Sequence, residues 1–210
     1  MTRITTSLDA FWQQFQDQET LSGSQLEAFK RYATLLIEWN ERFNLTAITD
    51  LKGIIHRHFS DSLVLRRFFD LQSIKTVADI GSGAGFPIIP LKIVCEHLKV
   101  VLIEVAQKRR EFLAKLIEDL NLRNVEICEL DFRTFLRTWE GAVDLFIARA
   151  SLDPAELVRI FKPSCSFKDS QLMYWAAAEW APSDQVRPFV RRIMPYTIDT
   201  VQRKLVLMQG

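Results

Sequence analysis

The sequence predicts an α/β protein whose mainly parallel, twisted sheet carries helices on both faces and follows an N-terminal helical extension. Two observations support this. From residue 72 onward, short apolar runs alternate with amphipathic segments, as in βαβ units. Residues 1–71, apart from 40–50, instead repeat apolar side chains at three- and four-residue steps, which is the helical period. We expect a helical cap over 1–71 and a sheet domain over 72–210, packed as one compact unit.

The sequence of the cap predicts three helices. A short one within residues 1–20 carries Phe11, Trp12 and Phe15 at helical spacing. A capping box at Ser24-Gln25-Leu26-Glu27 predicts the start of a second helix of about four turns. Residues 40–50 show no period and are expected to connect it to a third amphipathic helix over 54–69.

The sequence of residues 72–210 predicts alternating strands and helices, as in a parallel sheet. Expected strands cover residues 76–80, 100–103, 125–128, 143–148, 171–176 and 200–208. Expected helices cover 88–95, 107–120 and 154–161. We find no repeat, linker or low-complexity segment.

A glycine turn follows the first expected strand. Gly81, Gly83 and Gly85, three of the chain's seven glycines, fall within five residues, just after Asp79. Such a turn brings backbone close to a ligand and directs N–H groups at it, which indicates a nucleotide-like molecule. One tight turn needs only one glycine, so a purely structural role does not account for three.

The spacing of this turn excludes two common nucleotide motifs. A dinucleotide fingerprint needs a third glycine where Phe86 stands. No Gly-Lys-Ser/Thr closes the loop, so the phosphate-loop motif fails as well. The carboxylate of Asp79 would repel phosphate and attract a cation. The pattern therefore favours a ligand without pyrophosphate.

Polar residues follow the other expected strands, and ligands of open α/β sheets bind at the carboxyl ends of strands. Glu104 ends the second strand, about 20 residues after the first glycine, where an acidic residue hydrogen-bonds a ribose. Asp131, Phe132 and Arg133 follow the third strand, and Arg149 ends the fourth.

Composition and charge say less about the function than the motifs do. The 27 basic and 26 acidic residues give a net charge of +1, so any nucleic-acid surface must be local. Three scattered cysteines predict neither disulfides nor zinc and fit a reducing cytoplasm. No apolar run approaches the ~18 residues of a membrane span. His58 and Asp61 share a helix face, but two ligands make no metal site. We expect no metal and a monomer.

The motifs together resemble one family, the bacterial small-subunit (16S) ribosomal RNA methyltransferases that act on N7 of a guanine, known as RsmG or GidB. The glycine motif alone is typical of S-adenosylmethionine-dependent methyltransferases, and the upstream motifs narrow the resemblance. The matching pieces, over roughly residues 40–150, are Asn44-Leu45-Thr46-Ala47-Ile48, His58 with Asp61-Ser62-Leu63, Asp79 to Pro87 with Ile89-Pro90-Leu91, Lys108-Arg109 with Phe112-Leu113, Leu120-Asn121-Leu122 with Asn124-Val125, and Arg149-Ala150.

The resemblance implies a Rossmann-like class I methyltransferase fold, S-adenosyl-L-methionine as cofactor, and 16S rRNA or the small ribosomal subunit as partner. It implies that Gly81 and Phe86 line the methionine and adenosine parts, that Glu104 takes the ribose, and that Arg149 closes the site. The adenine would be flanked by Phe132-Arg133 or, one residue earlier, by Asp131-Phe132. For His58 and Asp61, the likeness favours a role in a cofactor lid.

The expected chemistry needs no catalytic acid or base. Guanine N7 has an in-plane lone pair and no proton, so catalysis consists of holding donor and acceptor in a near-attack geometry. The chain lacks both the Asn/Asp-Pro-Pro-aromatic motif of exocyclic-amine methyltransferases and the Pro-Cys nucleophile used at pyrimidine carbon 5. Phe86, Phe132 or Trp175 are candidates to stack on an unstacked target base.

The chain departs from the family downstream of residue 160. Lys162-Pro163-Ser164 stands where members carry Pro-Gly-Gly, and Trp175-Ala176 where they carry Lys-Gly, with Lys168 a possible substitute for that lysine. The C-terminal segment is basic and is a candidate phosphate-contacting surface. Its basic residues are Arg187, Arg191, Arg192, Arg203 and Lys204. Two alternatives stay open: a small-molecule methyltransferase, and a cofactor-binding module without catalysis.

Overall fold

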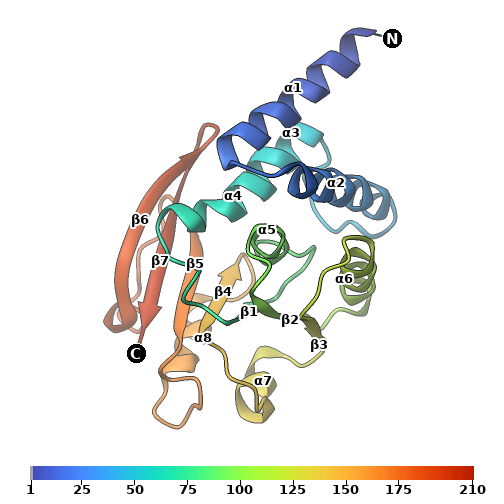
Figure 1. Cartoon of the computed structure of the whole chain (residues 1–210). Coiled ribbons are helices and arrows are strands. Elements are labelled where there is room, and N and C mark those ends of the chain that lie inside the picture. The colour runs from blue at the N-terminus through green and yellow to red at the C-terminus, as the bar shows by residue number, and fades with distance from the viewer. Residues whose placement is uncertain (1) are drawn as a thin grey trace.

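Seven strands form one sheet in the order β3-β2-β1-β4-β5-β7-β6 (Figure 1). The computed structural model describes residues 2–210, with side chains from residue 8 onward. The first five strands are parallel, whereas β7 is antiparallel to both β5 and β6. The strands are β1 Thr76–Ile80, β2 Lys99–Ile103, β3 Val125–Cys128, β4 Leu145–Arg149, β5 Gln171–Ala177, β6 Val190–Ile198 and β7 Val201–Gln209.

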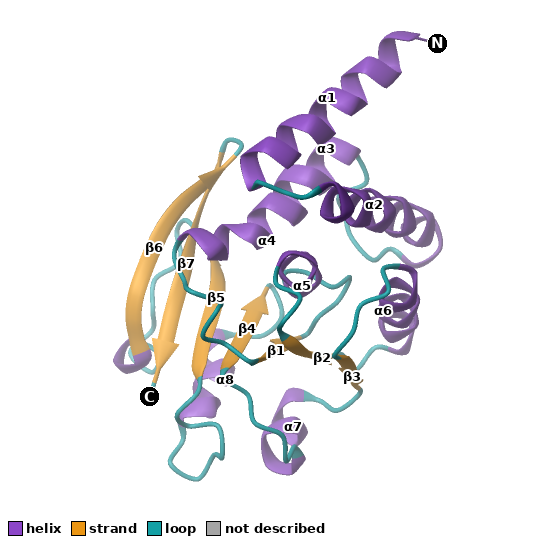
Figure 2. Cartoon of the chain, in the orientation of Figure 1, coloured by secondary structure: helices purple, strands orange, loops and turns teal. Residues whose placement is uncertain are grey.

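Helices cover both faces of this sheet (Figure 2). Helices α2, α5 and α6 lie on one face, and α7 and α8 lie on the other (Figure 1). The predicted fold class is therefore confirmed. The helices are α1 Thr2–Glu19, α2 Gly23–Phe43, α3 Leu51–Gly53, a π-helix Ile54–Ser60, α4 Asp61–Leu63, α5 Ile88–Val94, α6 Gln107–Asp119, α7 Phe132–Thr138 and α8 Pro154–Leu157, with 3₁₀ turns at Val64–Arg67, Val158–Phe161 and Arg187–Phe189.

The apolar strand runs reflect burial on both faces. On β1, Val77 belongs to the core shared with α2, α5 and α6, whereas its neighbour Ala78 belongs to the core shared with α7 and α8. Strands buried on both sides read as continuous apolar segments instead of alternating ones. This is why the central strands were predictable from short β-branched runs.

The N-terminal helices pack directly on the sheet domain. Phe15, Phe29 and Tyr32 are almost fully buried, and they join the core that includes α5 and the strands. The capping box lies two residues earlier than predicted, with Ser22 as the N-cap of α2. The Ser22 hydroxyl accepts from the Gln25 backbone N–H, and the Gln25 side chain accepts from the Ser22 backbone N–H. The Ser24-Glu27 pair lies inside the helix.

Two further expectations need correction. The predicted helix over 54–69 is instead a run of short segments centred on the π-helix Ile54–Ser60. Strand β6 was not predicted, because Pro195 lies in its middle. Proline is tolerated there because β6 is an edge strand that pairs only with β7. Helix α7 was also missed, although Asp131 caps it.

Candidate cofactor and methyl-transfer site

The glycine turn joins β1 to α5 at the carboxyl edge of the sheet. The N–H groups of Gly81 and Ser82 donate to the carbonyl of Ile103 on β2, at 2.9 and 3.2 Å. Gly81 has φ +71°, and a Cβ there would lie 2.6 Å from the Ser151 Cβ. Gly83 has φ +56°, and a Cβ there would meet nothing closer than 3.8 Å. The turn therefore bends back onto its neighbours at Gly81 and leaves open space beside Gly83.

Asp79, at the end of β1, is a buried carboxylate with no hydrogen bond to either oxygen in the described part of the chain. The pKa of Asp79 is raised to about 8, chiefly by burial and to a smaller extent by nearby Glu104, while Ser82 and the Arg149 guanidinium oppose the shift. An unpartnered carboxylate in the interior is costly. A cationic group placed beside Asp79 would restore its charge and supply the missing hydrogen bonds.

Glu104 ends the neighbouring strand β2 and faces the same turn. Its Oε2 accepts from the Gly83 N–H at 2.8 Å, and its Oε1 accepts from the Ala106 N–H at 2.9 Å. Each oxygen keeps a second lone pair, so the carboxylate can accept further hydrogen bonds. Its carboxylate thus lies beside Gly83 at the carboxyl edge of the sheet.

Phe86 is enclosed between two rings. The Tyr32 ring stacks on it at 5.1 Å between ring centres, and the His58 ring at 4.3 Å. The Arg149 guanidinium carbon lies 5.3 Å from the centre of the Phe86 ring. Tyr32 also donates to the carbonyl of Ala84 in the glycine turn. Phe86 is therefore a fixed wall of the site, held by residues from α2, the π-helix and β4.

Arg149 is held by three acceptors. Its Nη1 donates to Asp61 Oδ2 at 2.9 Å and to the Arg57 carbonyl at 3.4 Å, and its Nη2 lies 3.2 Å from His58 Nδ1. Arginine only donates, so His58 Nδ1 is the acceptor, and its Nε2–H then donates to Thr46 Oγ1 at 2.9 Å. Burial and the cations of Arg149, Arg57 and Arg203 lower the pKa of His58 to about 3. His58 is neutral at physiological pH.

Asp61 organises this cluster from a position with 1% side-chain exposure. Besides Arg149, its carboxylate accepts from the Tyr196 hydroxyl at 2.8 Å and from Arg203 Nη1 at 3.1 Å. Its carbonyl accepts from the Trp175 indole N–H at 3.0 Å. His58 and Asp61 were singled out as a motif, but no pattern in the sequence indicates that β5, β6 and β7 converge on them. Only the spatial arrangement of the hairpin reveals Tyr196 and Arg203.

The residues after β3 have mainly structural contacts. Asp131 Oδ1 accepts from the N–H groups of Arg133 and Thr134, and hydrogen bonds from Thr134 lower the pKa of Asp131. The Phe132 ring is buried in the core shared with α7 and α8. Arg133 is exposed and pairs with Glu156 at 2.7 Å. Their backbone borders the carboxyl edge, because α7 begins directly after β3.

The three rings expected to stack on a target base are all buried. Both faces of Phe86 are covered by Tyr32 and His58, Phe132 lies in the core, and Trp175 has 3% exposure. Lys168 precedes β5, at the opposite edge of the sheet from the glycine turn. It is therefore badly placed to substitute for a lysine at the carboxyl end of that strand.

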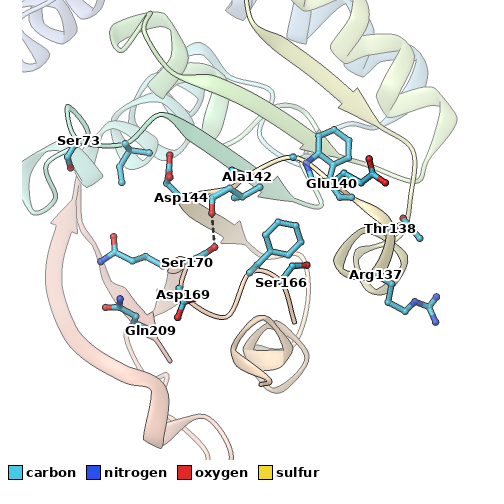
Figure 3. Close-up of a pocket in the computed structure, with 16 residues that line it drawn as sticks. Ser73, Arg137, Thr138, Glu140, Ala142, Asp144, Ser166, Asp169, Ser170 and Gln209 are labelled. Atoms are coloured by element: carbon cyan, nitrogen blue, oxygen red, sulfur yellow. Dashed lines mark hydrogen bonds between the residues drawn. The ribbon is translucent and has the colours of Figure 1, made fainter. Parts of the chain in front are cut away.

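A depression of about 1170 Å³ lies at the amino edge of the sheet (Figure 3). Residues before β1, β4 and β5 line it, among them Ser73, Asp144 and Ser170. The Ser170 hydroxyl donates to the Val143 carbonyl at 2.6 Å. This depression lies at the far end of the strands from Asp79, so it is not part of the candidate site.

Residues 2–210 show neither a metal-binding cluster nor a membrane-spanning helix. No group of three or more histidine, cysteine, aspartate or glutamate residues there is arranged to hold a metal ion. None of the described helices combines the length and the apolar character that crossing a bilayer requires.

Comparison with known proteins gives a family. Residues 25–202 match the family model described as rRNA small subunit methyltransferase G. The Ribosomal RNA small subunit methyltransferase G of Lysinibacillus sphaericus is 49% identical over 105 residues, which are 50% of this chain and 44% of that protein. The protein of the same name from Bacillus cereus (strain B4264) is 44% identical over 134 residues, which are 62% of this chain and 56% of that protein. The matches thus span about half the length of these relatives.

A solved structure supports the fold. The structure of M. capricolum TrmK in complex with the natural cofactor product S-adenosyl-homocysteine superimposes with a TM-score of 0.54. The identity is 14%, and the alignment covers 70% of this chain and 66% of the other. At this identity the likeness concerns the fold alone.

Proposed function

The chain belongs to the GidB family of small-subunit rRNA methyltransferases, and from that premise we propose that it transfers the methyl group of S-adenosyl-L-methionine to N7 of a specific guanine in 16S rRNA. The acceptor would be the rRNA of the small ribosomal subunit, which places the reaction in the bacterial cytoplasm. The observation that carries the proposal is the buried, unpartnered carboxylate of Asp79 beside the glycine turn.

The residues of this edge fit such a cofactor. Asp79 would hold the cationic amino group, which accounts for a carboxylate that is otherwise unsatisfied. Glu104 would accept from the ribose hydroxyls through its remaining lone pairs. The open space at Gly83 leaves room for close approach of a ligand. The segment Asp131 to Arg133 would border the adenine.

Positioning accounts for the chemistry. When bound, the cofactor would supply a methyl group on a sulfonium sulfur, which would leave as a neutral thioether as the bond from guanine N7 to the methyl carbon forms. Guanine N7 attacks with its own lone pair, so the protein needs to remove no proton from it. His58 fits this scheme, because its Nδ1 is engaged by Arg149 and is unavailable as a base. The fixed wall of Phe86 and Arg149 would instead orient the reacting groups.

The test measures transfer of labelled methyl groups from the cofactor to small-subunit particles of a bacterium that lacks its own enzyme of this family. The wild-type chain should label the rRNA of these particles. Asp79→Asn should bind the cofactor about 10- to 100-fold more weakly, since a hydrogen bond to a charged group contributes about 1.5–3 kcal/mol.

The matched control is Asp184→Asn, because the Asp184 side chain is fully exposed. Its Oδ1 lies 3.8 Å from Arg187 Nη2, which is too far for a hydrogen bond. This variant should behave as the wild type does. Cofactor binding without label in rRNA would overturn the rRNA assignment. It would favour a small-molecule methyltransferase or a binding module without catalysis.

A further inference from the structure

The structure divides the basic C-terminal segment between the two edges of the sheet. Strand β6 runs in the same direction as β5, because both are antiparallel to β7. Its first residues, including Arg191 and Arg192, therefore lie at the amino edge. Arg203, near the start of β7, lies at the carboxyl edge with the glycine turn. Only one end of the segment is thus close to the candidate site.

Arg203 belongs to a cluster with surplus positive charge. Arg149 and Arg203 both donate to the single carboxylate of Asp61, at 2.9 and 3.1 Å. Arg57, one residue before His58, adds a third guanidinium that acts on His58 together with the other two. Within residues 8–210, Asp61 is the only carboxylate within 4.0 Å of any of the three. Two guanidinium groups thus share one carboxylate, and the third has no carboxylate within 4.0 Å among these residues.

The surplus is directed outward. The Arg149 side chain has 11% exposure and is fixed against Phe86, whereas the Arg203 side chain has 36% exposure. Arg57 is exposed, and its guanidinium has no hydrogen bond to another described residue. Arg57, whose carbonyl accepts from Arg149, and Arg203, which shares the Asp61 carboxylate with it, are therefore both neighbours of the half-buried Arg149 at the carboxyl edge.

We propose that Arg57 and Arg203 contact backbone phosphates of the RNA strand that carries the target guanine. This inference rests on the proposed function and specifies where it binds its substrate. Guanidinium groups pair well with phosphate, and such contacts position a nucleic acid without reading its sequence. The pair lies beside the wall formed by Phe86 and Arg149, so an RNA held there presents its base to the same edge as the cofactor.

The amino-edge arginines do not form an equivalent site. Arg191 donates to the carbonyls of Pro188 and Gly210, at 2.9 Å each, and Arg187 faces Asp184. Arg192 is exposed and has no hydrogen bond to another described residue. It therefore resembles Arg57 in type and exposure but lies at the opposite edge, which makes it the matched control.

The test compares Arg57→Gln with Arg192→Gln in methyl transfer to small-subunit particles, measuring KM between about 50 and 200 mM salt. Loss of one phosphate contact should reduce the slope of log KM against log salt by about 1. We expect this reduction, with a raised KM at low salt, for Arg57→Gln. Arg192→Gln should match the wild type, and both exposed substitutions should leave thermal unfolding unchanged.

The possible outcomes separate the two proposals. An unchanged slope for Arg57→Gln, with the wild type still methylating rRNA, would overturn the phosphate pair and leave the proposed function intact. A reduced slope for Arg192→Gln alone would overturn it in favour of the amino edge. A wild-type chain that binds the cofactor but labels no rRNA would overturn the proposed function, and this inference with it.

Discussion

The buried carboxyl of Asp79 lowers the stability of the folded protein as pH rises. Its pKa is about 8 in the folded chain and 3.8 in an ordinary setting. Below 3.8 both states are protonated, and above 8 both are ionised. Between these values the unfolded chain gains the charge first, so Asp79 destabilises the fold increasingly as pH rises through this window. The residue is therefore suited to a ligand and not to packing.

We predict that Asp79→Asn removes this pH dependence. The free energy of unfolding of the variant, relative to the wild type, should increase with pH between about 4 and 8, by at most about 1.4 kcal/mol per pH unit. Denaturant unfolding without cofactor at several pH values measures the difference. A constant difference across this window would show that the Asp79 carboxyl is not protonated in the folded protein.

Cofactor binding should release a proton. A cationic ligand favours the ionised form of Asp79, whose pKa is about 8 in the free protein. Below that value, binding removes the proton, and the affinity should rise with pH by up to about tenfold per pH unit. Calorimetry at pH 7 in buffers of different ionisation enthalpy should give close to one proton released for the wild type and close to none for Asp79→Asn. Equal proton counts would contradict this role.

At the scale of elements, the glycine turn is the most constrained feature. We predict that Gly81→Ala destabilises the fold and weakens cofactor binding, because an alanine at φ +71° costs about 1–2 kcal/mol and its Cβ would clash with Ser151. Gly23→Ala is the control, since nothing lies within 4 Å of a Cβ there. Thermal unfolding of both variants tests this. Equal losses would mean that Gly81 needs no special backbone.

The hairpin β6–β7 should stabilise the cap through Asp61. Tyr196→Phe removes a buried hydrogen bond to this carboxylate and should lower the free energy of unfolding by about 1.5–3 kcal/mol. Tyr174→Phe is the matched control, because the Tyr174 hydroxyl bonds no described residue. Its effect should stay within about 0.5 kcal/mol in denaturant unfolding. Similar losses in both variants would assign the Tyr196 effect to packing alone.

Local chemistry decided which elements the sequence predicted. The central strands, the glycine turn and the positions of Asp79, Glu104 and Arg149 follow from apolar runs and from the rule that ligands bind at strand ends. Strand β6 contains a proline and exposes half its residues, so its pairing with β7 has no local signal. The cluster around Asp61 joins segments more than 80 residues apart, and spacing alone does not predict such contacts.

At the scale of the whole molecule, the two edges of the sheet carry different side chains. The carboxyl edge combines the buried carboxylate, the enclosed phenylalanine and the surplus of arginine charge. The N-terminal helices and the C-terminal hairpin β6–β7, which lie at the two ends of the sequence, meet at this edge (Figure 1). The proposed cofactor site and the proposed RNA surface thus depend on contacts between the two ends of the sequence.

The most direct test of the central claim locates the methyl group on the RNA. After methyl transfer to small-subunit particles lacking this modification, borohydride and aniline treatment cleaves RNA at guanines methylated on N7. The account predicts one cleavage site, which coincides with the labelled base and which Asp79→Asn produces only at a cofactor concentration about 10- to 100-fold higher. Label on another atom or base, or label in the particles without cleavage, would contradict it.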